Sequence, residues 1–406
     1  MKVTTDGTAG NRITFTNYPG ETVVFDANNR IYAIQVGIST NPANYVTVDG
    51  IECKGWTGYG IYCQQSDFIE LLRCNVHVED FDGTDQRGII LTGCDDALIE
   101  FCRVHHCLVG IRATTSLRGT IRNSILHDGF GATEALQNNC KGYAVANGCV
   151  QWLIHNVITF NWDDGSGDSN ETFGTPAEGE PMVEFRNVVA FNNGTRAGNT
   201  GGGGYGIKTK PDQVQSGGRD KVTGCYSFDN AGHGILLNSP AVMTGFDAWH
   251  NLSIRNGGDG ISGAYIEAQA STSKNNIIFS DNTGTDDSFN PTVANLNDYN
   301  LVKDGSFNVT YSPNSIAADP GFSDISDLDV DTDADGVPDV LEFLHTVADP
   351  LYPDVEASVT EAFAVLTTLF ALAGGSACID AGVISAPFSR DPYNGSAPDL
   401  GAIESA

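Results

Sequence analysis

Two short stretches of the sequence carry side chains that can bind a cation or move a proton. The first reads Asp163-Asp164-Gly165-Ser166-Gly167-Asp168, and the second, further along the chain, reads Gly206-Ile207-Lys208. Clustered carboxylates can hold a metal ion or a lysine ammonium, and a lysine accepts a proton only when it is neutral. On residue types alone, a surface ion pair between Lys208 and Asp163 or Asp164 is the simpler interpretation, and such a pair contributes little to stability.

A third acidic stretch has the spacing of a calcium-binding loop. Residues 331–342 read DTDADGVPDVLE, with acidic side chains at loop positions 1, 3, 5, 9 and 12 and a glycine at position 6. This is the spacing of an EF-hand loop, in which the glycine permits a sharp turn and the last glutamate chelates with both oxygens. We expect a structural Ca²⁺ ion bound by Asp331, Asp333, Asp335, the Val337 carbonyl, Asp339 and Glu342.

The segment that follows this loop has the pattern of a helix. From about 340 to 373 the apolar residues recur at helical spacing and place on one face Val359, Phe363, Leu366 and Phe370. We therefore expect a helical insertion before the last part of the chain.

The charge balance excludes one class of partner and constrains another. Lys and Arg total 21, Asp and Glu total 51, and the formal net charge is −30. Nucleic-acid binding needs clustered cations, so we expect no nucleic-acid partner. The same acidity repels anionic polysaccharides at long range, so such a substrate would need a local cationic site.

Membrane-spanning and targeting segments are not evident in the sequence. No stretch is long and apolar enough to span a bilayer, and no signal peptide is visible at Met1. We expect a processed or truncated chain that acts as a monomer.

Two sequence signatures alternate along most of the chain. One is an Asn or Cys followed by apolar residues two and four places later, as at Asn156, Asn187 and Asn275. The other is a glycine followed by an apolar residue, as at Gly88-Ile89 and Gly234-Ile235. Such period-two runs are strands with a buried face, and they bury it only when similar units stack.

This alternation predicts an all-β, right-handed parallel β-helix, with asparagines of successive coils hydrogen-bonded in ladders. Six residues should stack in buried rows, namely Ile158, Phe160, Val189, Phe191, Tyr226 and Phe228. We expect a β-helix with lateral loops over 1–325, the calcium loop and helical insertion over 326–374, and a C-terminal coil or cap over 375–406. A β-sandwich or propeller is the alternative, but propeller blades have steadier lengths.

With these motifs in place, the chain resembles the bacterial β-helix polysaccharide lyases. Its opening GTAGNRITF at 7–15 and its closing IDAG at 379–382 and DLGAIE at 399–404 are similar to the first and last coils of that superfamily. Residues 141–238 more specifically resemble polysaccharide lyase family 9, the pectate-lyase-like group. That family has an Asp-Gly motif, then Asp-Asp-Gly-x-Asp one coil later, then Gly-Phe-Lys one coil after that.

The resemblance implies that Asp163, Asp164 and Asp168 hold a calcium ion and that Lys208 is the catalytic base. Two departures bear on this. Lys141 stands where the first aspartate of the family would be, and the last aspartate is displaced by one residue, to Asp168. Because strand residues alternate between faces, we expect Asp168 to point inward unless Gly167 forms a bulge.

We expect Lys208 to point outward, because Ile207 must point in, and to lie within reach of Asp163 or Asp164. We expect Lys141 to share a row with Asp164, since each precedes the glycine of its coil, and its ammonium to contact that carboxylate in place of the metal. Residues that could line a groove here, with Lys141, are Trp162, Arg196, Tyr205, Lys210, Arg219 and His233.

These expectations predict a calcium-containing extracellular lyase that cleaves a pectate-like, uronate-containing polysaccharide by β-elimination. A β-helix that binds glycan or serves as a surface protein without catalysis is the first alternative. A β-helix glycoside hydrolase is the second, because Asp163-Asp164 and Gly232-His233-Gly234 resemble part of its pattern. The hydrolase pattern places an Arg-Ile-Lys after the Gly-His-Gly, whereas Ile207-Lys208 precedes it here and lacks the arginine.

Overall fold

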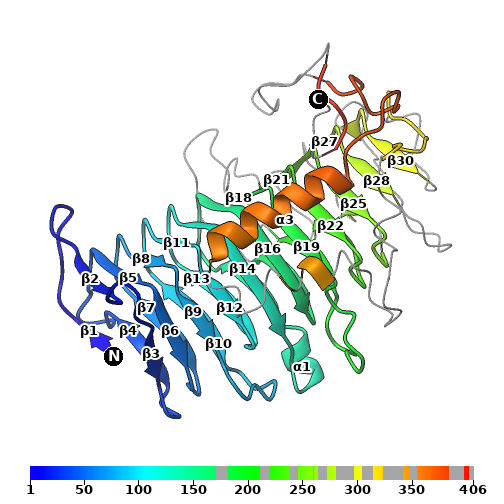
Figure 1. The fold of residues 1–406 in the computed structure, drawn as a ribbon. Coiled ribbons are helices and arrows are strands. Elements are labelled where there is room, and N and C mark those ends of the chain that lie inside the picture. Colours follow the sequence, from blue (N-terminus) through cyan, green and yellow to red (C-terminus); the bar gives the residue numbers. More distant parts are fainter. Residues whose placement is uncertain are drawn as a thin grey trace.

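The computed structural model describes residues 1–170, 182–210, 220–237, 246–258, 260–263, 272–279, 297–303, 314–322, 342–344, 346, 354–383 and 397–401. Short strands pair in parallel with their counterparts in the next coil, and the coils stack along one axis from the N-terminus to the C-terminal end (Figure 1). The predicted parallel β-helix is therefore confirmed.

One face of the solenoid is a ten-stranded parallel sheet that carries the sequence segments singled out above. Its neighbouring strands, in spatial order, are β1 (Lys2–Val3), β4 (Tyr32–Val36), β7 (Tyr59–Gln64), β10 (Arg87–Thr92), β13 (Val109–Thr114), β15 (Lys141–Ala146), β17 (Gly165–Asn170), β20 (Tyr205–Lys210), β23 (Ile235–Leu237) and β26 (Ile261–Gly263).

The other two faces form two series of strands. One series contains β2 (Ile13–Thr16), β5 (Val46–Asp49), β8 (Glu70–Leu72), β11 (Leu98–Glu100), β18 (Val183–Arg186), β21 (Asp220–Thr223), β24 (Phe246–Trp249), β27 (Thr272–Lys274) and β29 (Asn297–Asp298). The second contains β3 (Val23–Asp26), β6 (Ile51–Lys54), β9 (Asn75–His77), β12 (Arg103–His105), β19 (Val189–Phe191), β22 (Tyr226–Phe228), β25 (Leu252–Ile254), β28 (Ile277–Phe279) and β30 (Leu301–Lys303). Two long strands run through both series and join them, β14 (Thr120–Gly129) and β16 (Trp152–Trp162).

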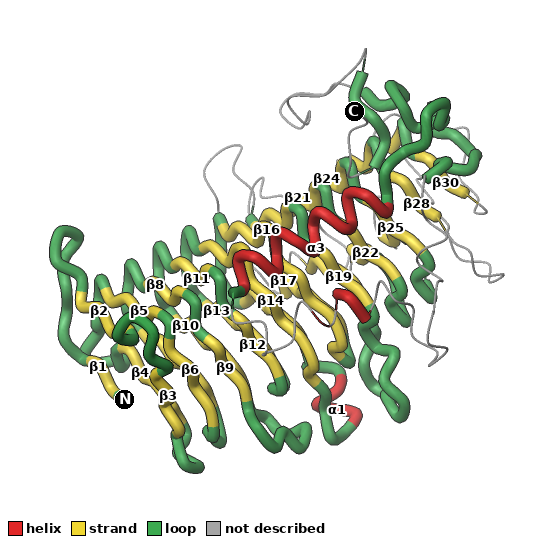
Figure 2. The backbone as a smooth tube through the Cα atoms, in the orientation of Figure 1, coloured by secondary structure: helices red, strands yellow, loops and turns green. Residues whose placement is uncertain are grey.

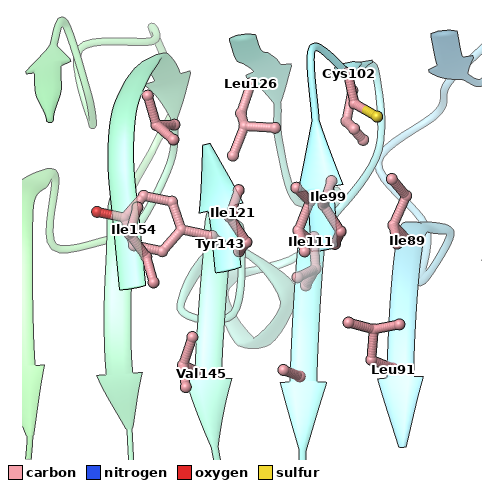
Figure 3. Packing of buried hydrophobic residues seen from close by; sticks show 14 of the residues in the cluster. Ile89, Leu91, Ile99, Cys102, Ile111, Ile121, Leu126, Tyr143, Val145 and Ile154 are labelled. Carbon is pink, nitrogen blue, oxygen red and sulfur yellow. The ribbon is translucent and has the colours of Figure 1, made fainter. Parts of the chain in front are cut away.

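The interior is filled by inward rows of apolar side chains in register. In the ten-stranded sheet, Ile89, Ile111 and Tyr143 pair across adjacent strands, and all three are fully buried (Figure 3). Because side chains alternate between faces, the residue after each of these points outward. The outward row of this sheet is the surface on which the candidate site lies.

Turns between strands are held by the predicted asparagine ladders. The Asn156 amide donates to Asn123 Oδ1 at 3.1 Å, and the Asn187 amide donates to Asn156 Oδ1 at 3.3 Å. All three residues have positive φ, near 50°, a conformation that asparagine tolerates better than most residues. A ladder of this kind fixes the register of successive coils.

The six residues predicted to stack in rows do so, but on the outer face. Ile158 pairs with Val189 and Val189 with Tyr226, and all are buried. These rows do not belong to the interior cluster, because they pack under helix α3 (Val355–Leu369). Period-two apolar runs do not reveal which face is inside when both faces are buried.

Helix α3 confirms the predicted apolar face, but it covers only Val355–Leu369 of the segment expected to be helical from about 340 to 373. Its N-cap is Asp354, whose side chain accepts from the Ala357 N–H at 3.1 Å. Val359 and Leu366 are buried, and the Phe370 ring lies 5.9 Å from the Tyr226 ring. The helix lies lengthwise over the strands of several coils, as Figure 2 shows in red. The described residues also contain the single-turn helix α1 (Glu134–Gln137).

The predicted calcium loop falls outside the described residues, apart from Glu342. No helix in the described ranges has the length and apolarity needed to cross a membrane.

Candidate active site

The candidate site is built around a buried lysine that two aspartates share. Lys141 Nζ lies 2.8 Å from Asp168 Oδ2 and 3.2 Å from Asp164 Oδ2. The three side chains are 10%, 1% and 6% exposed, respectively. The expected contact between Lys141 and Asp164 is therefore present, and the contact with Asp168 is closer still.

The register of β15 and β17 explains why Asp168 takes part. Lys141 is paired with Gly165, Tyr143 with Gly167, and Ala144 with Asp168. The expectation that Asp168 points inward is wrong, because the frame of this coil is shifted by one residue. It is Gly167 that shares the inward row, where the Tyr143 ring occupies the space that a side chain at 167 would need.

The same shift means that Lys141 and Asp164 are not row partners, although their side chains meet. The Tyr205 N–H donates to the Asp164 carbonyl at 2.8 Å, and the Gly203 N–H donates to Asp164 Oδ1 at 3.2 Å. The turn before β17 thus aims the Asp164 carboxylate at the lysine from outside the sheet.

Charge balance keeps Lys141 protonated. Burial alone lowers the pKa of the Lys141 ammonium, but the charges of Asp168 and Asp164 outweigh burial, and the net pKa is raised above its ordinary value. A lysine with a raised pKa holds its proton at neutral pH, so Lys141 is a fixed cation and not a base.

Lys208 lies on the same outward face but in a different environment. Its inward neighbour Ile207 is fully buried and pairs with Gly167 and Ile235, which leaves Lys208 half-buried on the outer side, as expected. Lys208 pairs in register with Asp168, one strand away. Among the described residues its ammonium makes no ion pair, and it lies 5.2 Å from the centre of the Tyr205 ring.

The expectation that Lys208 pairs with Asp163 or Asp164 does not hold among the described residues: Asp164 pairs with Lys141, and Asp163 is occupied elsewhere. Its two oxygens accept from Arg196 Nε at 2.9 Å and Nη2 at 2.7 Å, and the Gly131 N–H also donates to it at 2.9 Å. The Arg196 guanidinium also covers the Phe130 ring, 5.0 Å from its centre. Asp163 therefore fixes a loop beside the site, and its carboxylate does not reach Lys208.

The other predicted groove residues separate into three groups. Tyr205 and His233 are half-buried, with parallel rings 6.0 Å apart, beside Lys208. The Trp162 side chain is fully buried and donates to the Leu126 carbonyl. Arg219 and the side chain of Lys210 lie outside the described residues.

The pKa of Tyr205 is affected by the cluster of Lys141, Asp164 and Asp168. Burial raises the pKa of its hydroxyl, and the charges of Asp164 and Asp168 raise it further. Tyr205 therefore stays protonated near neutral pH, between the cluster and Lys208.

The calcium ion implied by the resemblance does not fit these donors. The Lys141 ammonium lies between the Asp164 and Asp168 carboxylates, and Arg196 engages both oxygens of Asp163. No group of three or more His, Cys, Asp or Glu side chains in the described ranges is arranged to hold a metal ion.

With this geometry established, comparison with known proteins identifies the family. The family model described as Pel9A-like, right-handed β-helix region, matches residues 1–276. The chain belongs to the Pel9A-like right-handed β-helix family. No curated protein matches the sequence.

Solved structures agree with the Pel9A-like fold. The crystal structure of pectate lyase Pel9A superposes with a TM-score of 0.57 at 19% identity, covering 97% of this chain and 86% of that one. An alginate lyase from Paenibacillus sp. str. FPU-7 gives a TM-score of 0.45 at 16% identity, covering 61% and 81%. A rhamnogalacturonan lyase gives 0.47 at 14% identity, covering 83% and 86%. At 19% identity the likeness to pectate lyase Pel9A shows the fold alone.

Proposed function

We propose that this protein is an extracellular polysaccharide lyase that cleaves a pectate-like polyuronate by β-elimination, with Lys208 as the base. One observation carries the proposal. Of the two lysines on this outward face, Lys141 is buried and held by two carboxylates, whereas Lys208 is half-exposed and makes no ion pair within the described part of the chain. Only a lysine of the second kind can lose its proton to solvent and then take one from a substrate.

The reaction balances as an elimination. The neutral Lys208 amine takes the proton from C5 of a uronate unit, the electrons of that C–H bond form the C4–C5 double bond, and the bond from C4 to the glycosidic oxygen breaks. The leaving oxygen takes a proton from solvent. Such a base contributes roughly 10²–10⁴-fold to a rate when it is correctly placed.

In this proposal the Lys141 ammonium replaces a metal ion in holding Asp164 and Asp168. The cluster contains one cation and two anions, so it positions the surface around Lys208 and does not add net positive charge. We therefore expect the chemical step to survive treatment with a chelator. Any effect of calcium would come from the loop at 331–342, far from this cluster in sequence.

Replacement of the family's first aspartate by Lys141 favours a second candidate, a glycan-binding β-helix without activity. A glycoside hydrolase is disfavoured, because it needs a free pair of carboxylates, one of them protonated, whereas Asp163 pairs with Arg196 and Asp164 pairs with Lys141.

The test is to incubate the full chain with polygalacturonate, alginate and rhamnogalacturonan, with and without chelator. An unsaturated uronate product, detected by ultraviolet absorbance, supports the lyase. New reducing ends without unsaturation would indicate a hydrolase, and binding without any cleavage would leave the glycan-binding candidate.

A further inference from the structure

We propose that Arg112 binds a carboxylate of the same polyuronate, at a second subsite on the outward face that bears Lys208. Arg112 belongs to β13, and its register partners continue through Ala144 and Asp168 to Lys208. Register partners in a parallel sheet point to the same face, so Arg112 and Lys208 belong to one row. The inference rests on the proposed function, because it assumes an anionic chain lying along that row.

The state of the Arg112 side chain sets it apart from the eight arginines that pair with carboxylates. Its Nε is enclosed and has no acceptor, and within the described part of the chain its guanidinium makes no hydrogen bond and no ion pair. Arginines elsewhere do pair with carboxylates, namely Arg12, Arg73, Arg87, Arg118, Arg122, Arg186, Arg196 and Arg255. In a chain with 51 acidic residues and 21 basic ones, an arginine without an acid partner is unexpected.

No carboxylate among the described residues pairs with the Arg112 guanidinium. Burial lowers the pKa of this group and the nearby Arg87 lowers it further, whereas the more distant charges of Asp85 and Asp168 oppose the shift in part. The Asp85 carboxylate already pairs with Arg87 Nε at 2.7 Å, and no ion pair joins it to Arg112. On its other side the next strand presents only the methyl group of Ala144 in the same row. A half-buried guanidinium with no protein acceptor is suited to a planar carboxylate from outside.

The distance between the two positions suits a polymer and not a single sugar. Three strand spacings separate Arg112 from Lys208, which is about 14 Å along the solenoid axis at the usual spacing of parallel strands. Lys141 cannot serve the same purpose, because two aspartates already hold it. Arg112 would therefore hold the polyuronate several sugar units away from the bond that breaks.

The experiment measures equilibrium binding of polygalacturonate in a Lys208→Ala background, in which turnover is suppressed. Arg112→Gln should weaken binding about tenfold or more, since a charge-assisted bidentate contact is lost. Arg112→Lys keeps the positive charge but cannot make a bidentate contact, so its affinity should lie between those of the Lys208→Ala parent and Arg112→Gln. Arg118→Gln is the matched control, because Arg118 is exposed and paired with Asp96, and it should bind as the parent does.

Binding of the methyl ester of the same polymer distinguishes recognition of the carboxylate charge from recognition of the sugar chain. Arg112→Gln should bind the ester as well as the Lys208→Ala parent does, because the ester offers no carboxylate. Equal binding of polygalacturonate by parent and Arg112→Gln, with both melting at the same temperature, would overturn the subsite. If the wild type binds but cleaves nothing while Arg112→Gln still loses affinity, the lyase proposal fails and the subsite stands. If the parent binds no polyuronate, both fail.

Discussion

At the scale of single residues, the most informative contact is the Lys141 ammonium between two carboxylates. Three charged groups that are together nearly excluded from water are stable only while they compensate one another. Removing the cation would leave Asp164 and Asp168 as uncompensated buried charges, whereas removing all three charges would leave a neutral contact.

We predict that Lys141→Met destabilises the fold by about 3–5 kcal/mol, measured by chemical denaturation. The triple variant Lys141→Met, Asp164→Asn, Asp168→Asn should recover most of this loss. Because the pKa of Lys141 is raised in the folded state, its contribution is complete below the unfolded pKa of about 10.4 and is lost as pH rises through the folded value. A Lys141→Met variant as stable as the wild type at pH 7 would contradict the ion cluster.

The sequence predicted part of this site, and its limits have a physical cause. The contact of Lys141 with Asp164 was predicted from a shared row, and it is present, but the register pairs Lys141 with Gly165 and the turn before β17 brings the Asp164 carboxylate to the lysine. The inward placement of Asp168 was wrong, because the coil frame was taken from Gly165, whereas the bulk of the Tyr143 ring puts Gly167 in the inward row. Side-chain volume in a neighbouring coil is not visible in a local pattern.

At the scale of elements, helix α3 completes the fold by covering apolar rows that face outward. Sequence periodicity predicted both the rows and the helix, but not that one packs on the other, because each pattern is local whereas their contact joins distant segments. The ladder asparagines were predictable because the same turn recurs in successive coils, so the local pattern repeats along the sequence.

Leu366→Ala tests this packing. Leu366 is fully buried against the outer rows, so we expect a loss of about 2–5 kcal/mol in the free energy of unfolding. The neighbouring Thr367 is exposed, and Thr367→Ala should change stability by less than about 0.5 kcal/mol. Similar effects of the two substitutions would show that the helix does not protect the sheet.

The loop at 331–342 is predicted to stabilise the fold by binding calcium. If it holds a calcium ion, Asp331→Ala should lower the melting temperature in calcium and have no effect in chelator, since the ion stabilises only the folded state. Differential scanning calorimetry in both buffers measures this. A loss of the same size in chelator would mean that the loop has a different role.

At the scale of the whole molecule, the net charge of −30 opposes any polyanionic substrate. Repulsion reaches about 30 Å at 0.01 M salt and about 8 Å at 0.15 M. We therefore predict that association with polygalacturonate becomes faster over that range, as followed by stopped-flow fluorescence, whereas association with its methyl ester does not change. Association that slows steadily with salt would indicate an attractive surface that the charge distribution does not provide.

The most direct test of the account compares elimination by the wild type, Lys208→Ala and Lys54→Ala on the polyuronate that the wild type cleaves best. Lys54 is a surface lysine paired with Glu79, away from the ten-stranded sheet. We predict that Lys208→Ala lowers the rate of unsaturated product by about 10²–10⁴-fold with an unchanged melting temperature, and that Lys54→Ala behaves as the wild type. A Lys208→Ala variant that retains full elimination activity would contradict the assignment of Lys208 as the base.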